Sequence, residues 1–386
     1  MSSSRQKPLV LAASSVFAGA SAYAFQLLAS SSSAPSEFAA LNGWIFYVSA
    51  AATAGVVLQY YVSLRGPRAR LTGPARTAMG VLAASVLGAT LVLSARLPPW
   101  ATGMLAVASQ LAYGYAFGAF QASADLVALA ALNVVVSVVR LGVPFALGLT
   151  AASFRSSMPA STSAATLVAV LFFRELAAKP AEPAATKPDS AWKPLLPALL
   201  LTGAATTFPF LDSLLVNAAL PDDVAGEFAR VQVAGRALFF GGLILLQVAY
   251  PYQLRAARGE GEAGGFWTSR ADGVATALVA LGGVVLTAGL PRVWPLWAKS
   301  ELPWSWPALV SVNFTLLFAL YARVQRAAAV KDVRGALVAA ALLAVAAVAV
   351  PRLGATVQTI GLAAGAFYAV ALVAMVVLRP ASPPPA

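Results

Sequence analysis

Three charged side chains fall inside long apolar stretches of the sequence, where a charge requires a specific cause. They are Arg140, Asp212 and Arg236. A charge at the centre of a bilayer costs about 2.5–3.5 kcal/mol on insertion scales, so such residues mark ion pairs, cavities or substrate pathways. We predict that Arg140 and Arg236 contact a phosphate group of a substrate. We predict that Asp212 binds a coupling ion or takes part in a conformational gate. The structural alternatives are a buried Asp212–Arg236 ion pair, and a polar partner such as Asn133 or Gln110 for Arg140.

Neutral amides and prolines in the apolar stretches extend this set of candidates. Asn133, Asn313 and Gln232 are candidate substrate-binding residues that would contact hydroxyl groups. Hydrogen bonding between membrane helices is the structural alternative for all three. Pro144 and Pro209 each remove a helix hydrogen bond and permit a bend, so we assign them to gating.

The residues that the chain lacks exclude several classes of chemistry. It contains no Cys and no His, which removes disulfides, thiolate and imidazole metal ligands, and Ser-His-Asp catalysis. It also has no GxxxxGK[ST] phosphate-binding loop. We expect no metal site and no resident cofactor, and we do not expect an enzyme.

Composition identifies the class of protein. Of the 386 residues, 60% are hydrophobic and 10% are charged, which is too little charge to cover a soluble globule. A membrane-crossing helix needs about 20 apolar residues. Apolar runs without the alternation of barrel strands indicate an all-α, multi-pass protein. We expect twelve spans, at 8–30, 38–64, 77–96, 99–121, 125–150, 160–177, 194–219, 227–252, 271–290, 304–325, 335–352 and 356–378.

The basic residues fix the expected orientation. The net charge is +12, and with the N-terminus inside, eighteen Lys and Arg residues fall on the cytoplasmic side and five on the outer side. This positive-inside distribution places both termini in the cytoplasm and explains the basic charge without nucleic acid. We expect Trp294, Trp297, Trp304 and Trp306 to form an interfacial aromatic belt, and Arg230 to anchor at the outer membrane edge.

The chain divides into two expected halves. Residues 1–177 and 194–386 would each form a six-helix lobe, and residues 178–193, rich in Ala, Pro and charge, would link them. Glu37-Phe38-Ala39 and Glu227-Phe228-Ala229 open equivalent spans at an offset of 190 residues. Two six-helix halves that face the same way are typical of transporters that rock between two open states.

Several segments resemble the multidrug/oligosaccharidyl-lipid/polysaccharide (MOP) flippase superfamily, and its polysaccharide-transport branch in particular. They are FPFLDSLLV at 208–216, DDVAGEFA at 222–229 followed by Tyr250-Pro251, YGYAFGAFQ at 113–121, and residues 126–141. The resemblance implies two six-helix lobes of the MOP/MATE type that alternate access. It also implies coupling to an ion gradient such as H⁺ or Na⁺, or to cargo consumption, instead of ATP.

The implied cargo is a saccharide on a polyprenyl phosphate or diphosphate carrier. It would be flipped from the inner to the outer leaflet of a bacterial cytoplasmic membrane for export of cell-surface polysaccharide. The expected partners are this lipid-linked saccharide, membrane lipid and other polysaccharide-assembly proteins. A multidrug or small-molecule exporter of the same superfamily is the nearest alternative, and a polytopic glycan-assembly enzyme is a more distant one.

Overall fold

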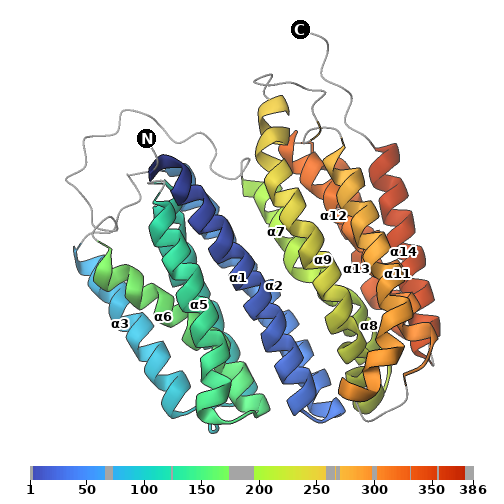
Figure 1. The fold of residues 1–386 in the computed structure, drawn as a ribbon, viewed down its shortest axis with the longest axis horizontal. Coiled ribbons are helices and arrows are strands. Elements are labelled where there is room, and N and C mark those ends of the chain that lie inside the picture. Colours follow the sequence, from blue (N-terminus) through green and yellow to red (C-terminus); the bar gives the residue numbers. More distant parts are fainter. Residues whose placement is uncertain are drawn as a thin grey trace. The chain divides into compact units, whose positions relative to one another are not determined.

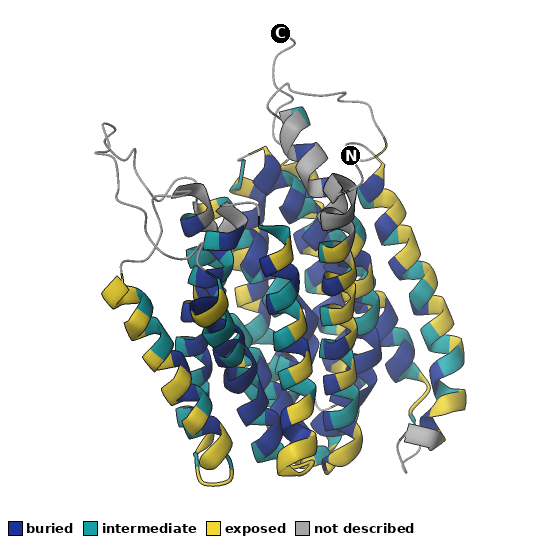
Figure 2. Ribbon diagram, turned by 60° about the vertical axis from the view of Figure 1, so that its left-hand side comes forward, coloured by how far each residue is buried: buried dark blue, intermediate teal, exposed yellow. Residues whose placement is uncertain are grey.

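The structure is a computed structural model, and it describes residues 3–65, 73–122, 125–173, 195–257, 266, 270–297, 302–330, 332–353 and 356–378. Every element in these ranges is a helix, which confirms the predicted all-α class. The expected linker at 178–193 lies outside the described residues. Several helices carry exposed residues along one side and buried residues along the other (Figure 2).

The helices fall into two compact units, which we describe separately. Unit 1 comprises Met1–Ser33 and Tyr47–Leu199, and unit 2 comprises Ala34–Phe46 and Leu200–Ala386. The helix α2 (Pro35–Arg65) therefore contributes its first residues to unit 2 and the remainder to unit 1.

Unit 1 is organised around α6. It contains α1 (Ser3–Ser32), most of α2, α3 (Gly73–Val92), α4 (Pro99–Ala122), α5 (Leu126–Leu147) and α6 (Ala151–Phe172). The helix α6 packs against α4. It also packs against α3 and α5, and α1 packs against α5 (Figure 1). Asp125 accepts a hydrogen bond of 3.0 Å from the backbone amide of Ala128, so it caps α5 at its N-terminus.

Unit 2 is organised around α12. Its helices are α7 (Leu195–Thr207), the 3₁₀ segment η3 (Phe208–Phe210), α8 (Leu211–Ala219), α9 (Asp222–Ala257), α11 (Ala271–Trp297), α12 (Ser305–Ala329), α13 (Arg334–Leu353) and α14 (Val357–Val377). The helix α12 packs against α9, α11 and α14. Phe239 lies in edge contact with Phe314, Phe318 and Tyr321, which fixes α9 against α12.

The two units share a pattern of helix pairs. The contacts of α4 with α6, α5 with α6, and α1 with α5 in unit 1 have counterparts in unit 2, where α12 packs with α14, α13 with α14, and α8 with α13. Other pairs differ, since α3 packs against α6 in unit 1 while α11 packs against α9 and α12 in unit 2.

Nine helices in the described ranges are long and apolar enough to cross a membrane. They are Pro35–Gln59, Gly73–Val92, Leu126–Leu147, Leu199–Ala219, Asp222–Leu246, Ala271–Pro295, Ser305–Ala329, Arg334–Leu353 and Val357–Val377. The helices α1, α4 and α6 are not among them, and α1 is rich in Ser and α6 in Ser and Thr, while α4 carries two Gln and two Tyr residues.

Two expectations about unit 2 are wrong for Trp294, Trp306 and Arg230, and the side chain of Trp297 lies outside the described residues. Trp294 and Trp306 are buried in the core of unit 2, where Trp306 packs edge-on against Phe228, and Trp304 alone of these three is exposed. Arg230 is also buried and pairs with Glu227 at 3.0 Å. The sequence of an apolar helix does not show which side of it faces the rest of the protein. These side chains lie on sides that face the core of unit 2.

Candidate functional site

The candidate site in unit 2 begins at a break in a membrane-spanning helix. The stretch Leu199–Ala219 is interrupted by the 3₁₀ turn at Phe208–Phe210, with Pro209 in its first positions. Proline has no amide hydrogen and its ring clashes with the preceding turn, so a regular α-helix cannot continue through it undisturbed. Interrupted membrane helices carry backbone polar groups to the interior of a protein.

Asp212 lies in the first turn of α8, directly after this break, and is only 3% exposed. The hydroxyl of Tyr368 on α14 donates to its Oδ1 at 2.5 Å, and Nδ2 of Asn313 on α12 donates to its Oδ2 at 2.9 Å. The N-terminus of a helix also favours a negative charge. In the described part of the chain no cation pairs with Asp212, so neutral donors hold this carboxylate.

Close packing of α12 against α14 positions Asn313. Its Nδ2 also donates to the carbonyl oxygen of Gly361 at 3.1 Å. A Cβ atom at Gly365 would lie 2.7 Å from Oδ1 of Asn313, nearer than real Cβ contacts allow. Glycine at position 365 therefore leaves the space in which Asn313 reaches Asp212.

Arg236 on α9 contacts the same η3–α8 junction and is 1% exposed. Its Nε donates to the carbonyl oxygen of Pro209 at 3.0 Å, and its Nη2 donates to Oγ of Ser213 at 2.9 Å. The guanidinium carbon lies 4.2 Å from the ring centroid of Phe210, a cation–π geometry. The η3–α8 junction thus carries a carboxylate at Asp212 and binds the guanidinium of Arg236 through Pro209 and Ser213.

Ser213 connects Arg236 to the buried amide Gln232. Its hydroxyl donates a short hydrogen bond to Oε1 of Gln232, while accepting from Arg236. The structure therefore brings five predicted residues together around η3 and α8: Asp212, Arg236, Gln232, Asn313 and Pro209. Asp212 and Arg236 do not form the ion pair considered as an alternative, because α8 presents Asp212 to α12 and α14 and Ser213 to α9.

The other three predicted residues lie on α5 in unit 1. Arg140 is half-buried, and its Nε is buried without a hydrogen-bond partner in the described part of the chain. Tyr113 on α4 is close enough to interact with it electrostatically. Asn133 donates to Oγ of Ser14 at 3.4 Å, which links α5 to α1. The helix α5 continues through Pro144 to Leu147.

Sequence reasoning missed three residues of this site: Tyr368, Ser213 and Phe210. Tyr368 is fully buried and is the one tyrosine in α14, whose other polar side chains, Gln358 and Thr359, lie in its first turn. A hydroxyl at that position is a signal of a polar partner. Ser213 and Phe210 lie close to Asp212 in the segment 208–216, which resembles the MOP flippases. Their contacts with Arg236 on α9 cannot be predicted from the spacing of residues along the sequence.

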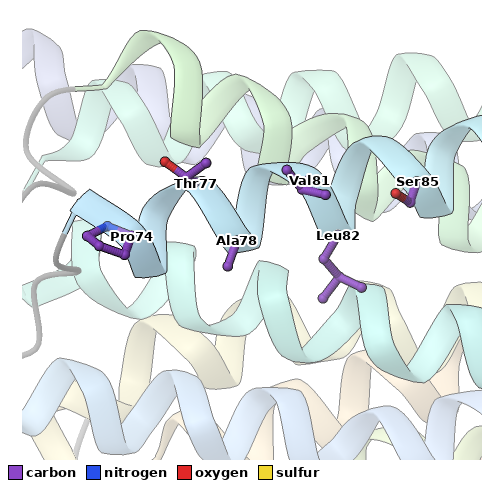
Figure 3. Close-up of a pocket in the computed structure, with 6 residues that line it drawn as sticks. All are labelled: Pro74, Thr77, Ala78, Val81, Leu82 and Ser85. Carbon is purple, nitrogen blue, oxygen red and sulfur yellow. The ribbon is translucent and has the colours of Figure 1, made fainter.

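Metal ligands and a hollow on α3 are the remaining candidate features. No group of three or more Asp or Glu residues that could hold a metal ion occurs among the described residues. A hollow along α3 is lined by Pro74, Thr77, Ala78, Val81, Leu82 and Ser85, all from the one helix (Figure 3). It carries no charged side chain, and Val81 and Leu82 are exposed as membrane-facing residues would be.

Comparison with solved structures defines the fold. The eukaryotic MATE transporter AtDTX14 is similar with a TM-score of 0.56 and 14% identity, covering 97% of this chain and 96% of that one. A MATE protein in the bent conformation has a TM-score of 0.54 and 13% identity, covering 96% and 93%. No family model and no curated protein matches the chain.

A third similar structure is a MOP superfamily transporter from Pyrococcus furiosus, for which reverse polarity of the binding pocket suggests a different function. Its TM-score is 0.50 and its identity 13%, covering 96% of this chain and 92% of that one. The chain therefore has a MATE-like fold, and its structural neighbours are MATE and MOP superfamily transporters.

Proposed function

We propose that this chain is a twelve-span, alternating-access transporter of the MOP superfamily with both termini in the cytoplasm. It moves a saccharide linked to polyprenyl phosphate or diphosphate from the inner to the outer leaflet of a bacterial cytoplasmic membrane. The product serves export of cell-surface polysaccharide, together with other polysaccharide-assembly proteins. The MATE-like fold and the transporter neighbours support the general class.

The observation that carries the choice of cargo is the state of Arg140. This guanidinium lies within the apolar span Leu126–Leu147, and its buried Nε has no hydrogen-bond partner among the described residues. A cation at that depth is costly unless an anion or polar ligand reaches it. Guanidinium groups bind phosphate oxygens through two parallel hydrogen bonds, so a phosphate-bearing lipid suits Arg140.

The residues of unit 2 complete the proposed machinery. Arg236 adds a second guanidinium, and Gln232, Asn313 and Asn133 add amides suited to hydroxyl groups. Asp212 binds H⁺ or Na⁺ in one state of the cycle. In the other state its carboxylate accepts the hydrogen bonds from Tyr368 and Asn313. Pro209 and Pro144 allow α8 and α5 to bend during the cycle, since each weakens the helix hydrogen-bond ladder.

The test compares membranes from cells with and without the protein by mass spectrometry of lipid-linked saccharides. We expect a polyprenyl-linked saccharide to accumulate in its absence, together with loss of a surface glycan. Purified protein in vesicles should then expose a fluorophore-labelled polyprenyl diphosphate disaccharide to dithionite, which does not cross the bilayer. An unchanged lipid pool and an unchanged bleached fraction would contradict the proposal.

A multidrug or small-molecule exporter is the second candidate, and Asp212 is the observation that favours it. A buried carboxylate held by neutral donors suits a cationic cargo as well as an ion. Cationic drugs should then lose toxicity in cells that make the protein, and Asp212→Asn should restore it. A lipid-linked saccharide should in that case be left untouched by the purified protein.

A further inference from the structure

The helix α2 belongs to two units along its length, with residues 35–46 in unit 2 and residues 47–65 in unit 1. A helix shared in this way must lose contacts on one side if the two units move against each other, as an alternating-access transporter requires. The contacts of its two parts therefore indicate which attachment is permanent and which is released.

The part of α2 in unit 1 is attached to α4 through glycines. A Cβ atom at Gly114 would lie 2.1 Å from the carbonyl oxygen of Gly55. A Cβ atom at Gly118 would lie 2.5 Å from the carbonyl oxygen of Gln59. Both pairs are spaced by one helical turn, so the two backbones stay in contact over that turn. Among the described residues of α2, none after residue 46 has a buried side-chain polar atom without a hydrogen-bond partner.

The part of α2 in unit 2 is attached to α8 and α9. A Cβ atom at Gly226 on α9 would lie 1.7 Å from the carbonyl oxygen of Pro35, so these two backbones also touch. Nδ2 of Asn217 on α8 donates to the carbonyl oxygen of Ala39 at 3.1 Å. Packing therefore holds the first turn of this segment, and a hydrogen bond holds the second.

This second attachment differs from the first because it contains buried amide atoms that the protein does not satisfy. Asn42 is 1% exposed and lies on the same face of α2 as Ala39 and Phe46, at helical spacing. Neither its Nδ2 nor its Oδ1 has a hydrogen-bond partner in the described part of the chain, and Oδ1 of Asn217 has none there either. A buried polar group without a partner weakens a contact about fivefold to 150-fold.

The same segment of α2 also contacts the candidate site. The ring centroid of Phe46 lies 6.3 Å from that of Phe210 in η3. The guanidinium of Arg236 lies 4.2 Å from the same Phe210 ring. Release of the segment would therefore remove a neighbour of the ring on which Arg236 rests, so the attachment and the site are physically linked.

We propose that the contact of residues 35–46 with α8 and α9 is a gate that opens during the transport cycle, and that the amide of Asn42 prevents it from locking shut. Closing the gate takes this amide out of water without giving it a protein partner, and opening the gate returns it to water. The difference favours opening and offsets part of the packing at Gly226 and Phe46. The inference rests on the proposed function for the need of a gate, but its test uses no cargo.

Cysteine accessibility measures the gate directly, because the natural chain has no cysteine. The reporter is Ala39→Cys, at a position that is 2% exposed, in the full-length protein purified in detergent. We expect a hydrophilic maleimide to label this cysteine slowly, through the open state. The control is Ala106→Cys on α4 in unit 1, at a position that is 1% exposed, and it should stay unlabelled.

Two substitutions should change the labelling rate of the Ala39→Cys reporter in opposite directions. Asn42→Leu replaces the amide with an apolar side chain, so it should slow labelling at least about fivefold and raise the unfolding temperature. Gly226→Ala should speed labelling, because the added Cβ atom would push α9 away from Pro35.

Gln325→Met is the matched control for the loss of a buried amide in unit 2. Nε2 of Gln325 donates to the carbonyl oxygen of Leu246 at 2.8 Å and to Oε1 of Gln253 at 3.2 Å, so this amide is satisfied. We expect Gln325→Met to lower the unfolding temperature and to leave the labelling rate unchanged.

The remaining outcomes also decide the question. An Ala39→Cys reporter as fully protected as Ala106→Cys would show a permanent contact and overturn the gate. An unchanged labelling rate or a lower unfolding temperature in Asn42→Leu would overturn the role of the amide. A gate that opens in a protein that moves no labelled lipid in vesicles would support this inference and reject the proposed function.

Discussion

Tyr368 on α14 donates a hydrogen bond of 2.5 Å to Asp212 on α8, although 156 positions separate the two residues. Asn313 on α12 occupies the second carboxylate oxygen of Asp212 at 2.9 Å. One carboxylate therefore joins three helices of unit 2. Any ion that binds to Asp212 competes with these two donors and changes how the three helices are held together.

Replacing Tyr368 with Phe tests this connection, because it removes the hydroxyl and little else. We expect a loss of roughly 1.5–3 kcal/mol in the free energy of unfolding, the range for a hydrogen bond to a charged group. A double-mutant cycle with Asp212→Asn should show coupling between the two positions. Denaturant unfolding of the purified protein measures both. Additive losses would show that Tyr368 does not act through Asp212.

Replacing Gly365 with Ala tests the space beside Asn313. The added Cβ would lie 2.7 Å from Oδ1 of Asn313, so the amide must move away from Asp212. We expect a destabilisation of about 1–3 kcal/mol, as for overpacking of a core. Gly289→Ala on α11 is the control, because nothing lies within 4 Å of its Cβ position. Equal unfolding temperatures for the two variants would contradict the packing argument.

Replacing Arg140 with Ala should abolish transport without reducing the yield of folded protein. Nε of Arg140 is buried and has no hydrogen-bond partner in the described part of the chain, so the substitution breaks no hydrogen bond at that atom. Dithionite bleaching of labelled lipid in vesicles measures transport, and size-exclusion chromatography measures folding. Arg334→Ala is the control, since that side chain is 90% exposed. Transport by Arg140→Ala at the wild-type rate would remove Arg140 from the cargo site.

The orientation can be tested directly because the natural chain has no cysteine. A single cysteine at Pro221, between α8 and α9, should react with a membrane-impermeant maleimide on intact cells. A single cysteine at Val330, between α12 and α13, should react only after the cells are permeabilised. Both positions are exposed in the structure. The reverse labelling pattern would place the termini outside.

The sequence predicted the all-α class, and local features of the chain explain why some of the candidate residues lie together. Asp212 and Arg236 lie on α8 and α9, whose short connection made them neighbours in prediction, and Pro209 marked the point where the span is interrupted. These features depend on helix periodicity and on the missing amide of proline, both of which are local.

The partners of Asp212 could not be predicted because they come from helices far along the chain. Hydropathy shows that α12 and α14 are apolar, but not which faces of them meet α8. The same gap explains the error at Trp294 and Trp306, which lie in the protein core instead of at the lipid interface. Packing determines which face of each helix is buried, through contacts such as that between Gly365 and Asn313.

The 3₁₀ turn at Phe208–Phe210 has a consequence for how a cation is tolerated at this depth. In a regular helix each carbonyl oxygen is directed along the helix to its own amide partner. The carbonyl of Pro209 accepts a hydrogen bond from the guanidinium of Arg236 on a neighbouring helix. The irregular turn thus acts as a fixed solvent molecule, and the peptide backbone provides part of the hydration that the bilayer denies to Arg236.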